Sequence, residues 1–421
     1  MPVLSKAWSP LLLFVDGSET RLLPAMSGTD DAWKPVSYEE RNWEPALDVR
    51  DSSSAHVTAS GPYRASVPPL IAAAEVRLGT TTAALATEAT AELIRFDTEL
   101  GRAGNPLIPV LLRLECAASS AIEQVTAPAQ AIMLAEIDES LEPHARQIVS
   151  HVRADEMALA AAGSLNEVAI VQVQRTLIAS SRPDRRGRWR DQQVWLGGGS
   201  AGPQRAPFVP PHQSRLPQLM ADLIAFARRD DLPALAQIAI AHAQYETVHP
   251  FLEVNGRTGR AVMQAMLRRA DLTRAVVVPL SAGLLRDTAA YFDALRHYRS
   301  GRIAPIVEVF AGAAHTAVAS SRVLIDDLAD ARGRWDARST SRKGSGARRL
   351  VSLLERQPVI NSRLAVSCLG VTPPNAQLAI DRLVSDGILV QIGSSRRNRS
   401  WAAMDVLDAM DAFMERARRE R

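Results

Sequence analysis

The stretch QYETVHPFLEVNGRTGR, residues 244–260, decides how this 421-residue chain is organised. Before it, the apolar run LAQIAIAHAQYETV has helical spacing, and the run stops at His249, because the residue before a proline is disfavoured in the helical region. After a short loop, GRAVMQAMLRRA resumes a helical pattern. The sequence therefore predicts a helix that ends at His249 and a loop that leads into the N-terminus of a second helix.

The residues around this helix N-terminus are suited to binding a polyphosphate. Free backbone N–H groups and the helix dipole attract anions, and Gly256 can adopt the left-handed geometry that turns successive amides toward one anion. Arg257 and Arg260 lie three apart on one side of the first turn, where each can fork onto phosphate oxygens. Glu253 is a hard oxygen ligand for Mg²⁺, and His249 can accept a proton near neutral pH. Together they predict a phosphate cradle with its own base.

HPFLEVNGRTGR resembles the signature of Fic domains, His-x-Phe-x-Asp/Glu-Gly-Asn-Gly-Arg-x-x-Arg, and the lead-in AHAQYETVHPF is similar to theirs. Fic domains are adenylyltransferases that move AMP from ATP to a Ser, Thr or Tyr hydroxyl of a target protein, and a few members remove AMP or move other phosphate-containing groups. The resemblance implies a mainly α protein, a Fic-type helical bundle with a β-hairpin flap. It also implies ATP as substrate and Mg²⁺ as the metal.

Carried over position by position, the resemblance makes His249 the catalytic base and Glu253 the magnesium ligand. Asn255 and the backbone around Gly256 are then expected to hold the α-phosphate, and the two arginines the β- and γ-phosphates. The expected nucleotide-binding residues of this segment are Val254, Asn255, Gly256, Arg257, Thr258, Gly259 and Arg260.

Val254 departs from the signature, because it stands where the family has its first glycine. If this position needs a positive φ, a β-branched residue there costs on the order of 1–3 kcal/mol and misplaces the amides that face the α-phosphate. If the position is right-handed helical, valine is tolerated. The sequence leaves both alternatives open.

The part of the chain before the Fic core divides into two regions. Residues 1–60, with scattered Pro and Trp, are expected to form an extended N-terminal arm, and residues 61–165 a helical region. Within the latter, SSAIEQ is similar to the inhibitory motif of autoinhibited Fic proteins, Ser/Thr-x-x-x-Glu-Gly/Asn, with Gln124 at its last position. By resemblance, Ser119 and Glu123 are inhibitory residues, and Glu123 pairs with Arg260 in place of the γ-phosphate. The alternative is an ordinary exposed glutamate.

The Fic core is expected over residues 166–320. Residues 193–196 and 206–209 flank a Gly-rich turn, which predicts a hairpin, and the segment 190–209 resembles the Fic flap, on whose edge the target protein docks. In a later helix, Tyr291 and Phe292 are candidates to lie against adenine. Aromatic residues at helical spacing are also typical of a core.

The C-terminal part is expected to comprise a helix and linker over residues 321–347 and a small winged helix-turn-helix domain over residues 348–421, with three helices followed by two short strands around a basic tip. The third helix is expected to bury Leu378, Ile380, Leu383 and Val384. The candidate DNA-binding residues are Asn375, Gln377, Arg382, Arg396, Arg397 and Arg399. Winged helices also serve as protein-interaction or dimerisation modules, so DNA, another protein and a homodimer are alternative partners.

Composition excludes some classes of protein. The apolar run at residues 11–15 is far too short to span a bilayer and lacks the shape of a signal peptide, so we expect a soluble cytoplasmic protein without a membrane partner. Cys116 and Cys368 lie in separate expected domains, which indicates buried small residues rather than a disulfide. The sequence thus predicts an autoinhibited protein adenylyltransferase. The alternative is a DNA-binding regulator that uses a catalytically weak Fic fold as a nucleotide sensor or interaction scaffold.

Overall fold

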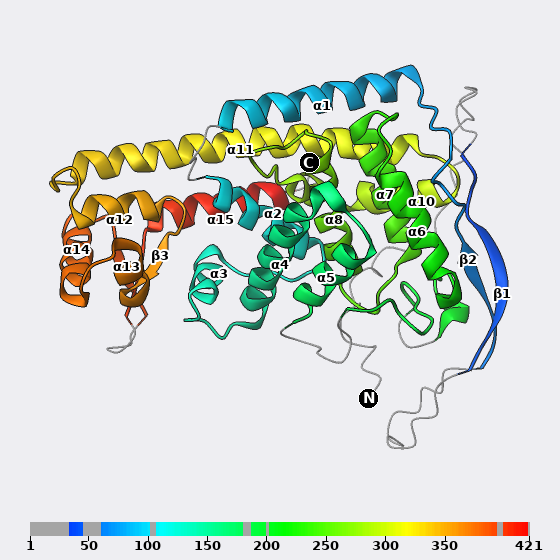
Figure 1. The fold of residues 1–421 in the computed structure, drawn as a ribbon, viewed down its shortest axis with the longest axis horizontal. Helices are drawn as coiled ribbons and strands as arrows, with labels where there is room; N and C mark the ends of the chain where they lie inside the picture. The colour runs from blue at the N-terminus through cyan, green and yellow to red at the C-terminus, as the bar shows by residue number, and fades with distance from the viewer. Residues whose placement is uncertain are drawn as a thin grey trace.

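The computed structural model describes residues 33–44, 60–101, 107–179, 187–198, 202–393 and 399–419. It is mainly helical, as the sequence predicts, with one long helix, α11 (Ala304–Arg338), running along the molecule (Figure 1). Helix α1 (Thr80–Leu100) packs on it from one side and α15 (Met404–Arg418) from another. The 35-residue α11 therefore joins the N-terminal and central helices to the C-terminal unit.

The described part of the N-terminal region is an antiparallel hairpin rather than an isolated arm. Strand β1 (Ser37–Trp43) pairs with β2 (Gly61–Val67) along its whole length. Residues 61–67 are therefore a strand, and the first helix of the helical region expected over residues 61–165 begins only at Thr80, after an irregular stretch with two prolines. The Asp222 carboxylate fixes that stretch, because it accepts hydrogen bonds from the backbone amides of Ile71 and Ala72.

Five helices lead to the central pair. Helix α2 (Ile108–Ile122) is followed by α3 (Ala129–Glu136), α4 (Pro143–Ala160), α5 (Glu167–Leu177) and α6 (Leu216–Ala227). Helices α4 and α5 begin after N-cap residues. The side chains of Glu142 and Asn166 accept hydrogen bonds from backbone amides in the first turns of these two helices. Helix α2 packs on α4, α8 and α9, which places it beside the predicted site.

The predicted helix–loop–helix consists of α7 (Ala234–Val248) and α8 (Asn255–Arg269). Every residue of α7 from Leu235 to Val248 is buried, as in a helix surrounded by others. Helices α9 (Leu280–Leu285) and α10 (Thr288–Arg299) complete the packing around α11. The loop between α7 and α8 is thus carried by rigid elements on both sides.

The C-terminal unit consists of α12 (Gly346–Leu354), β3 (Val359–Asn361), α13 (Ser362–Leu369), α14 (Pro373–Ser385), β4 (Val390–Ile392) and β5 (Ser400–Ala402). The strands form one sheet in the order β3-β5-β4, and β3 was not expected from the sequence. In α14, Ile380 and Leu383 are buried as predicted. Leu378 and Val384 are exposed, at 67% and 39%, because the buried stripe follows Ala376, Ala379, Ile380 and Leu383 at helical spacing.

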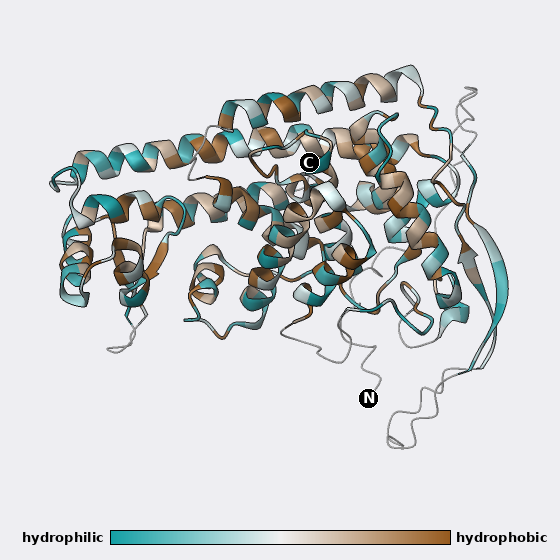
Figure 2. Ribbon diagram, viewed as in Figure 1, coloured by the Kyte–Doolittle hydropathy of each residue, from teal (hydrophilic) through white to brown (hydrophobic). Residues whose placement is uncertain are grey.

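One hydrophobic core runs from the N-terminal helices through the C-terminal unit, and a second, smaller cluster joins the hairpin to the predicted flap. Figure 2 shows apolar residues gathered where the helices meet, whereas the β1–β2 hairpin is mostly hydrophilic. Among the helices of the described segments, none has both the length and the apolar character needed to traverse a lipid bilayer.

Candidate active site

His249 lies at the C-terminal end of α7 and leaves the helix in a left-handed conformation, with φ 50° and ψ 62°. Its amide still donates to the Tyr245 carbonyl at 2.9 Å, so the helix ends at this residue, as Pro250 predicts. The imidazole is buried, and burial lowers the pKa of His249 from 6.5 to about 3, with further lowering from the positive charges of Arg190 and Arg299. At neutral pH the ring is therefore uncharged and able to accept a proton.

The loop after His249 is closed by Asn255. The Phe251 amide donates to Asn255 Oδ1 at 2.8 Å, and Asn255 Nδ2 donates back to the Phe251 carbonyl at 2.8 Å. Phe251 itself is fully buried and anchors the loop. Because both polar groups of Asn255 are engaged with the backbone, its side chain shapes the loop and does not point freely toward a phosphate, which differs from the role expected from the sequence.

The left-handed residue at the start of α8 is Val254, not Gly256. Val254 has φ 61° and ψ 26°, whereas Gly256 has ordinary helical geometry within the first turn. This settles the two alternatives that the sequence left open, because the position does need a positive φ. A β-branched residue in this region is strained by on the order of 1–3 kcal/mol.

Arg260 is buried and fully engaged by the end of α2. Its Nε donates to Ser119 Oγ at 2.7 Å, and its Nη2 donates to the Ser119 carbonyl at 2.8 Å and to Glu123 Oε1 at 3.1 Å. Burial opposes the charged guanidinium, but the neighbouring Glu123 carboxylate raises the pKa of Arg260 above its usual value. The side chain of Glu123 remains 28% exposed, so the pair lies at the edge of the site.

The Glu123 carboxylate occupies the N-terminus of α8. A Cβ added at Gly256 would overlap Glu123 Oε1 and come within 3.0 Å of Arg260 Nη1, so only glycine leaves room for the carboxylate here. The residue after it, Gln124, has φ 62°, the conformation that favours the Gly or Asn of the resembling motif. An acid therefore lies where the helix dipole and free amides favour an anion.

Arg257 and Glu253 lie on the more open side of the loop. Among the described residues, Arg257 Nε has no hydrogen-bond partner, and burial lowers the pKa of this guanidinium, while Glu123 and Glu253 counteract the shift. Glu253 is partly exposed. The two arginines expected to bind phosphate are thus in different states, because Arg260 is paired and Arg257 retains an unused donor.

The other residues expected to contact the nucleotide are packed against their neighbours within the protein. Thr258 is buried, and its hydroxyl donates to the Val254 carbonyl at 2.8 Å. A Cβ at Gly259 would come within 2.8 Å of the Tyr245 ring, so this glycine permits the close approach of α7 and α8. Tyr291 is 1% exposed and lies 2.7 Å from His242 Nε2 through its hydroxyl, which makes it a core residue here, while Phe292 is half-buried beside it.

The predicted flap is a hairpin with minimal pairing. Among the described residues of the flap, which exclude 199–201, the two arms meet in one antiparallel bridge, Leu196 with Phe208, in place of the hairpin strands expected. The reason is tertiary contact, because the second arm pairs with β2 instead, where the Ser66 amide donates to the Val209 carbonyl at 3.0 Å. Trp43 and Trp195 add an edge-to-face contact at 5.2 Å.

Sequence reasoning missed three charged residues around His249. Arg190 is buried at the base of the flap, Arg299 places its guanidinium 3.7 Å from the Phe208 ring centre, and Glu246 is buried one turn before His249. Burial raises the pKa of Glu246 to about 7, against the lowering effect of Arg260. Glu246 lies in the lead-in AHAQYETVHPF but was given no role there, and for Arg190 an arginine shortly before a predicted flap strand was a usable signal.

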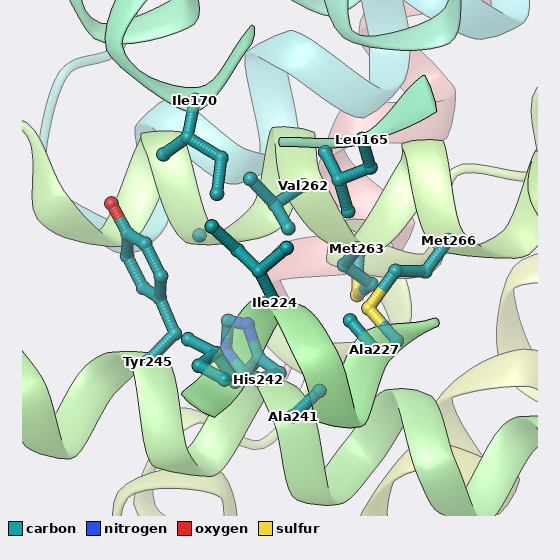
Figure 3. Close-up of a pocket in the computed structure, with 12 residues that line it drawn as sticks. Leu165, Ile170, Ile224, Ala227, Ala241, His242, Tyr245, Val262, Met263 and Met266 are labelled. Carbon is teal, nitrogen blue, oxygen red and sulfur yellow. The ribbon is translucent and has the colours of Figure 1, made fainter. Parts of the chain in front are cut away.

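A cavity lies behind the loop, between α6, α7 and α8 (Figure 3). It is lined almost wholly by apolar side chains, among them Ile224, Val262 and Met263. His249 and both phosphate-site arginines are absent from its walls. It is therefore a gap in core packing and not the nucleotide site.

One cluster of potential metal ligands is present in the described residues, formed by buried Cys116, His151 and Asp155. Cys116 Sγ lies 3.4 Å from Asp155 Oδ2, and Ser120 Oγ lies 3.0 Å from His151 Nδ1. These contacts join α2 to α4 below the Glu123 end. The thiol and imidazole make this set unlike the oxygen ligands that Mg²⁺ prefers.

The predicted DNA-binding residues have mixed environments. Asn375 is exposed on α14, but Gln377 donates to Asp381 at 2.7 Å and Arg382 lies 3.3 Å from Asp386. Arg399 lies over the Trp401 ring at 5.3 Å. Arg396 and Arg397 lie outside the described residues.

Comparisons with known proteins agree with this geometry. Residues 164–267 match the model of the Fic/DOC family. The chain is similar to "Protein adenylyltransferase Fic" of Drosophila erecta, at 27% identity over 145 residues, and to that of Nematostella vectensis, at 24% over 142 residues. These matches cover 34% of this chain in each case, but 26% and 30% of the relatives, so the alignment spans less than a third of each relative.

The fold is also similar to the crystal structure of a Fic family protein from Desulfovibrio desulfuricans G20. The TM-score is 0.50 at 19% sequence identity, over 78% of this chain and 97% of that chain. The likeness concerns the fold alone, and it extends well beyond the segment that the family model matches. Helix α7, the loop and most of α8 thus lie within the segment that matches the Fic/DOC family model.

Proposed function

We propose that this protein is an autoinhibited protein adenylyltransferase, which transfers AMP from ATP to a Ser, Thr or Tyr hydroxyl of a target protein. The observation that carries the proposal is the placement of a neutral, buried His249 at one end of a short loop and a basic helix N-terminus at the other. The matched relatives carry the name of this activity.

The chemistry assigned to the site is a single displacement. The target hydroxyl oxygen attacks the α-phosphorus of ATP, its proton passes to the His249 imidazole, and the bond from the α-phosphorus to the leaving pyrophosphate breaks. Positioning and charge neutralisation supply most of the rate in such reactions, and a base adds about 10²–10⁴-fold. Arg257 and Arg260 would neutralise charge on the β- and γ-phosphates.

Glu253 fits a magnesium site. It is a partly exposed carboxylate in the loop beside the phosphate-binding amides, and Mg²⁺ in nucleotide sites is commonly held by one or two carboxylates together with substrate phosphates. When bound, the ion would neutralise phosphate charge. Asn255 would act indirectly, by holding the loop in shape around Phe251.

Glu123 is proposed to be the inhibitory residue. Its carboxylate lies against the α8 N-terminus and pairs with Arg260, so a polyphosphate that uses the same seat has to displace it. Ser119 strengthens the competition, since two of the three hydrogen bonds that Arg260 makes to α2 go to this serine. The protein would therefore bind ATP weakly, or in an unproductive position, until α2 moves or loses its acid.

The target is proposed to dock on the flap, residues 190–209. An extended peptide can add to an exposed strand edge through main-chain hydrogen bonds, and the flap has only one internal bridge in its described residues. One edge of the flap is already used by β2 at Val209. The docking segment would thus pair with the arm that contains Leu196.

Incubation with radiolabelled ATP and Mg²⁺ tests the proposal. The Glu123→Gly variant should label itself or an added target with ATP that carries the label on the α-phosphate, and not with ATP labelled on the γ-phosphate. His249→Ala introduced into that variant should abolish the labelling. Transfer of the γ-label would identify phosphoryl transfer, and no transfer of either label would contradict the proposal.

For residues 346–402 we propose a winged helix-turn-helix unit. The order of its elements and the exposed Asn375 side of α14 support this assignment. The pairing of Gln377 and Arg382 with acidic neighbours favours a protein partner over DNA. Salt-dependent binding of a duplex, lost on Asn375→Ala and Arg399→Ala together, would instead support the DNA-binding alternative.

A further inference from the structure

Arg190 is a buried arginine whose side-chain hydrogen-bond partners among the described residues are all carbonyl oxygens. It is 3% exposed, and its side chain donates to the carbonyls of His249, Gln192, Pro211 and Val248. Burial lowers the pKa of its guanidinium to about 10, so it remains charged at neutral pH. A buried cation held only by neutral carbonyls is costly, which makes its location informative.

Two of these carbonyls are at the end of α7. The Nε–His249 carbonyl distance is 2.9 Å, and Nη2 lies 3.4 Å from the Val248 carbonyl. The last carbonyls of a helix have no partner within it, and the C-terminal end of the dipole favours a positive charge. Arg190 therefore caps the helix at the point where His249 turns into its left-handed conformation.

The other contacts reach the loop and both arms of the flap. The Arg190 amide donates to the Pro250 carbonyl at 2.9 Å, and the guanidinium holds Gln192 in the first arm and Pro211 just beyond the second. The adjacent Gln193 adds a second tie, because its Nε2 donates to the Pro210 carbonyl at 2.8 Å. One side chain thus connects the imidazole-bearing backbone with the surface proposed to dock the target.

We propose that Arg190 is a positioning residue, which holds His249 and the flap in one fixed relation so that a docked hydroxyl lies within reach of the imidazole. The inference rests on the proposed function and adds the device that aligns its two parts. None of the hydrogen bonds of Arg190 within the described residues reaches Arg257 or Arg260, so its effect should fall on the transfer step and not on nucleotide binding. A misplacement of about 1 Å can cost roughly 10²-fold in rate.

The experiment compares three substitutions in the Glu123→Gly parent. Arg190→Met keeps length and apolar volume without donors, and Arg190→Lys keeps the charge with fewer, differently directed donors. Arg188→Met is the matched control, because Arg188 lies two residues away, is 60% exposed, and forms a 3.5 Å ion pair with exposed Asp191. For each protein, the unfolding midpoint, the Kd for ATP and the self-labelling rate at saturating ATP are measured.

We expect Arg190→Met to lower the labelling rate at saturating ATP by about 10²-fold, with the Kd for ATP within about twofold of the parent. The labelling rate of Arg190→Lys should also be lower than that of the parent, and the rate of Arg188→Met should equal that of the parent. If Arg190→Lys labelled at the rate of the parent, the result would contradict the claim that several directed hydrogen-bond donors are needed at this position. Equal losses of ATP affinity and rate in the methionine variant would reduce Arg190 to a structural residue and overturn the proposal.

Hydrogen exchange supplies a readout that does not depend on catalysis. The amides of residues 248, 249, 251 and 252 should exchange faster in Arg190→Met than in the parent, and at the parent's rate in Arg188→Met. If the parent itself fails to label, the proposed function fails, but the exchange rates still decide whether Arg190 holds this backbone. Unchanged exchange in Arg190→Met would refute the positioning role.

Discussion

The loop between α7 and α8 is held from two sides by contacts of opposite kinds. On the α8 side, the Glu123 carboxylate pairs with Arg260 at 3.1 Å. On the α7 side, the Arg190 guanidinium is bound to carbonyls, with the His249 carbonyl at 2.9 Å. The first contact places an anion where a phosphate would bind, whereas the second uses only neutral backbone groups.

The difference indicates which side is reversible. A polyphosphate offers Arg260 the same charge and oxygen geometry as a carboxylate, so it can replace Glu123. The carbonyl partners of Arg190 are neutral backbone groups that do not occupy the expected phosphate seat, so a bound polyphosphate does not have to displace them. In the proposed function, the α8 side is therefore a removable lock, and the α7 side a permanent support for the base.

The largest expected effect comes from removing the base. In the Glu123→Gly parent, His249→Ala should lower the labelling rate by about 10²–10⁴-fold, because the target hydroxyl then keeps its proton during attack. The measurement is transfer of α-labelled phosphate over time. His144→Ala, at an exposed histidine of α4, is the control and should label like the parent. Undiminished labelling without His249 would show that the base lies elsewhere.

Removing the lock should have the next largest effect. Glu123→Gly should raise the rate of labelling at subsaturating ATP by about 10- to 100-fold, which corresponds to the loss of one charged hydrogen bond worth roughly 1.5–3 kcal/mol. Glu88→Ala removes an exposed acid from α1 and should leave the rate unchanged. A lower rate in Glu123→Gly would mean that the pair supports the site instead of blocking it.

A third prediction concerns stability and pH. The pKa of His249 is about 3 in the folded protein against 6.5 ordinarily, so above pH 6.5 neither state binds the proton. Below pH 6.5 the unfolded state takes up a proton that the folded state refuses, and stability falls by about 1.4 kcal/mol per pH unit until the pH nears 3. The unfolding free energy of His249→Ala should lack this contribution, so wild type should lose about 1 kcal/mol more than the variant between pH 6.5 and pH 5.5. If the unfolding free energies of wild type and His249→Ala changed with pH in parallel, the low pKa of His249 would be contradicted.

The smallest effect is expected at Val254. Val254→Gly should raise the free energy of unfolding by about 1 kcal/mol, because glycine relieves the strain at φ 61° at the expense of a more flexible unfolded chain. Val262→Gly, in the interior of α8, should instead destabilise the protein. Denaturant unfolding measures both. Destabilisation by Val254→Gly would mean that valine packing outweighs the backbone strain.

Some features of the candidate site could be predicted from the sequence, and others could not. The end of α7 at His249 and the loop before α8 followed from local chemistry, since a residue before proline leaves the helix. The sequence allows a left-handed Gly256 and leaves the conformation of Val254 open. In the structure Val254 is left-handed, and glycine at 256 is required by the neighbouring carboxylate and not by its own backbone angles. Residue type alone does not distinguish these two reasons for a glycine.

The remaining differences arise from long-range contacts. Arg190 and Arg299 come from segments far from the motif, and only the folded chain brings them to His249. The flap shows one bridge because its second arm pairs with β2, a strand about 140 residues earlier in the sequence. Likewise, Leu378 follows an apolar pattern but lies on the outer side of α14. Local periodicity contains no information on such pairings.

The affinity for ATP tests the central claim most directly, because it isolates the competition between Glu123 and a polyphosphate. Calorimetric titration of wild type and Glu123→Gly with ATP and Mg²⁺ should give a Kd about 10- to 100-fold lower for the variant, and AMP, which lacks the β- and γ-phosphates, should show a much smaller difference. Equal ATP affinities of the two proteins would contradict the account, because the carboxylate would then not occupy the phosphate seat.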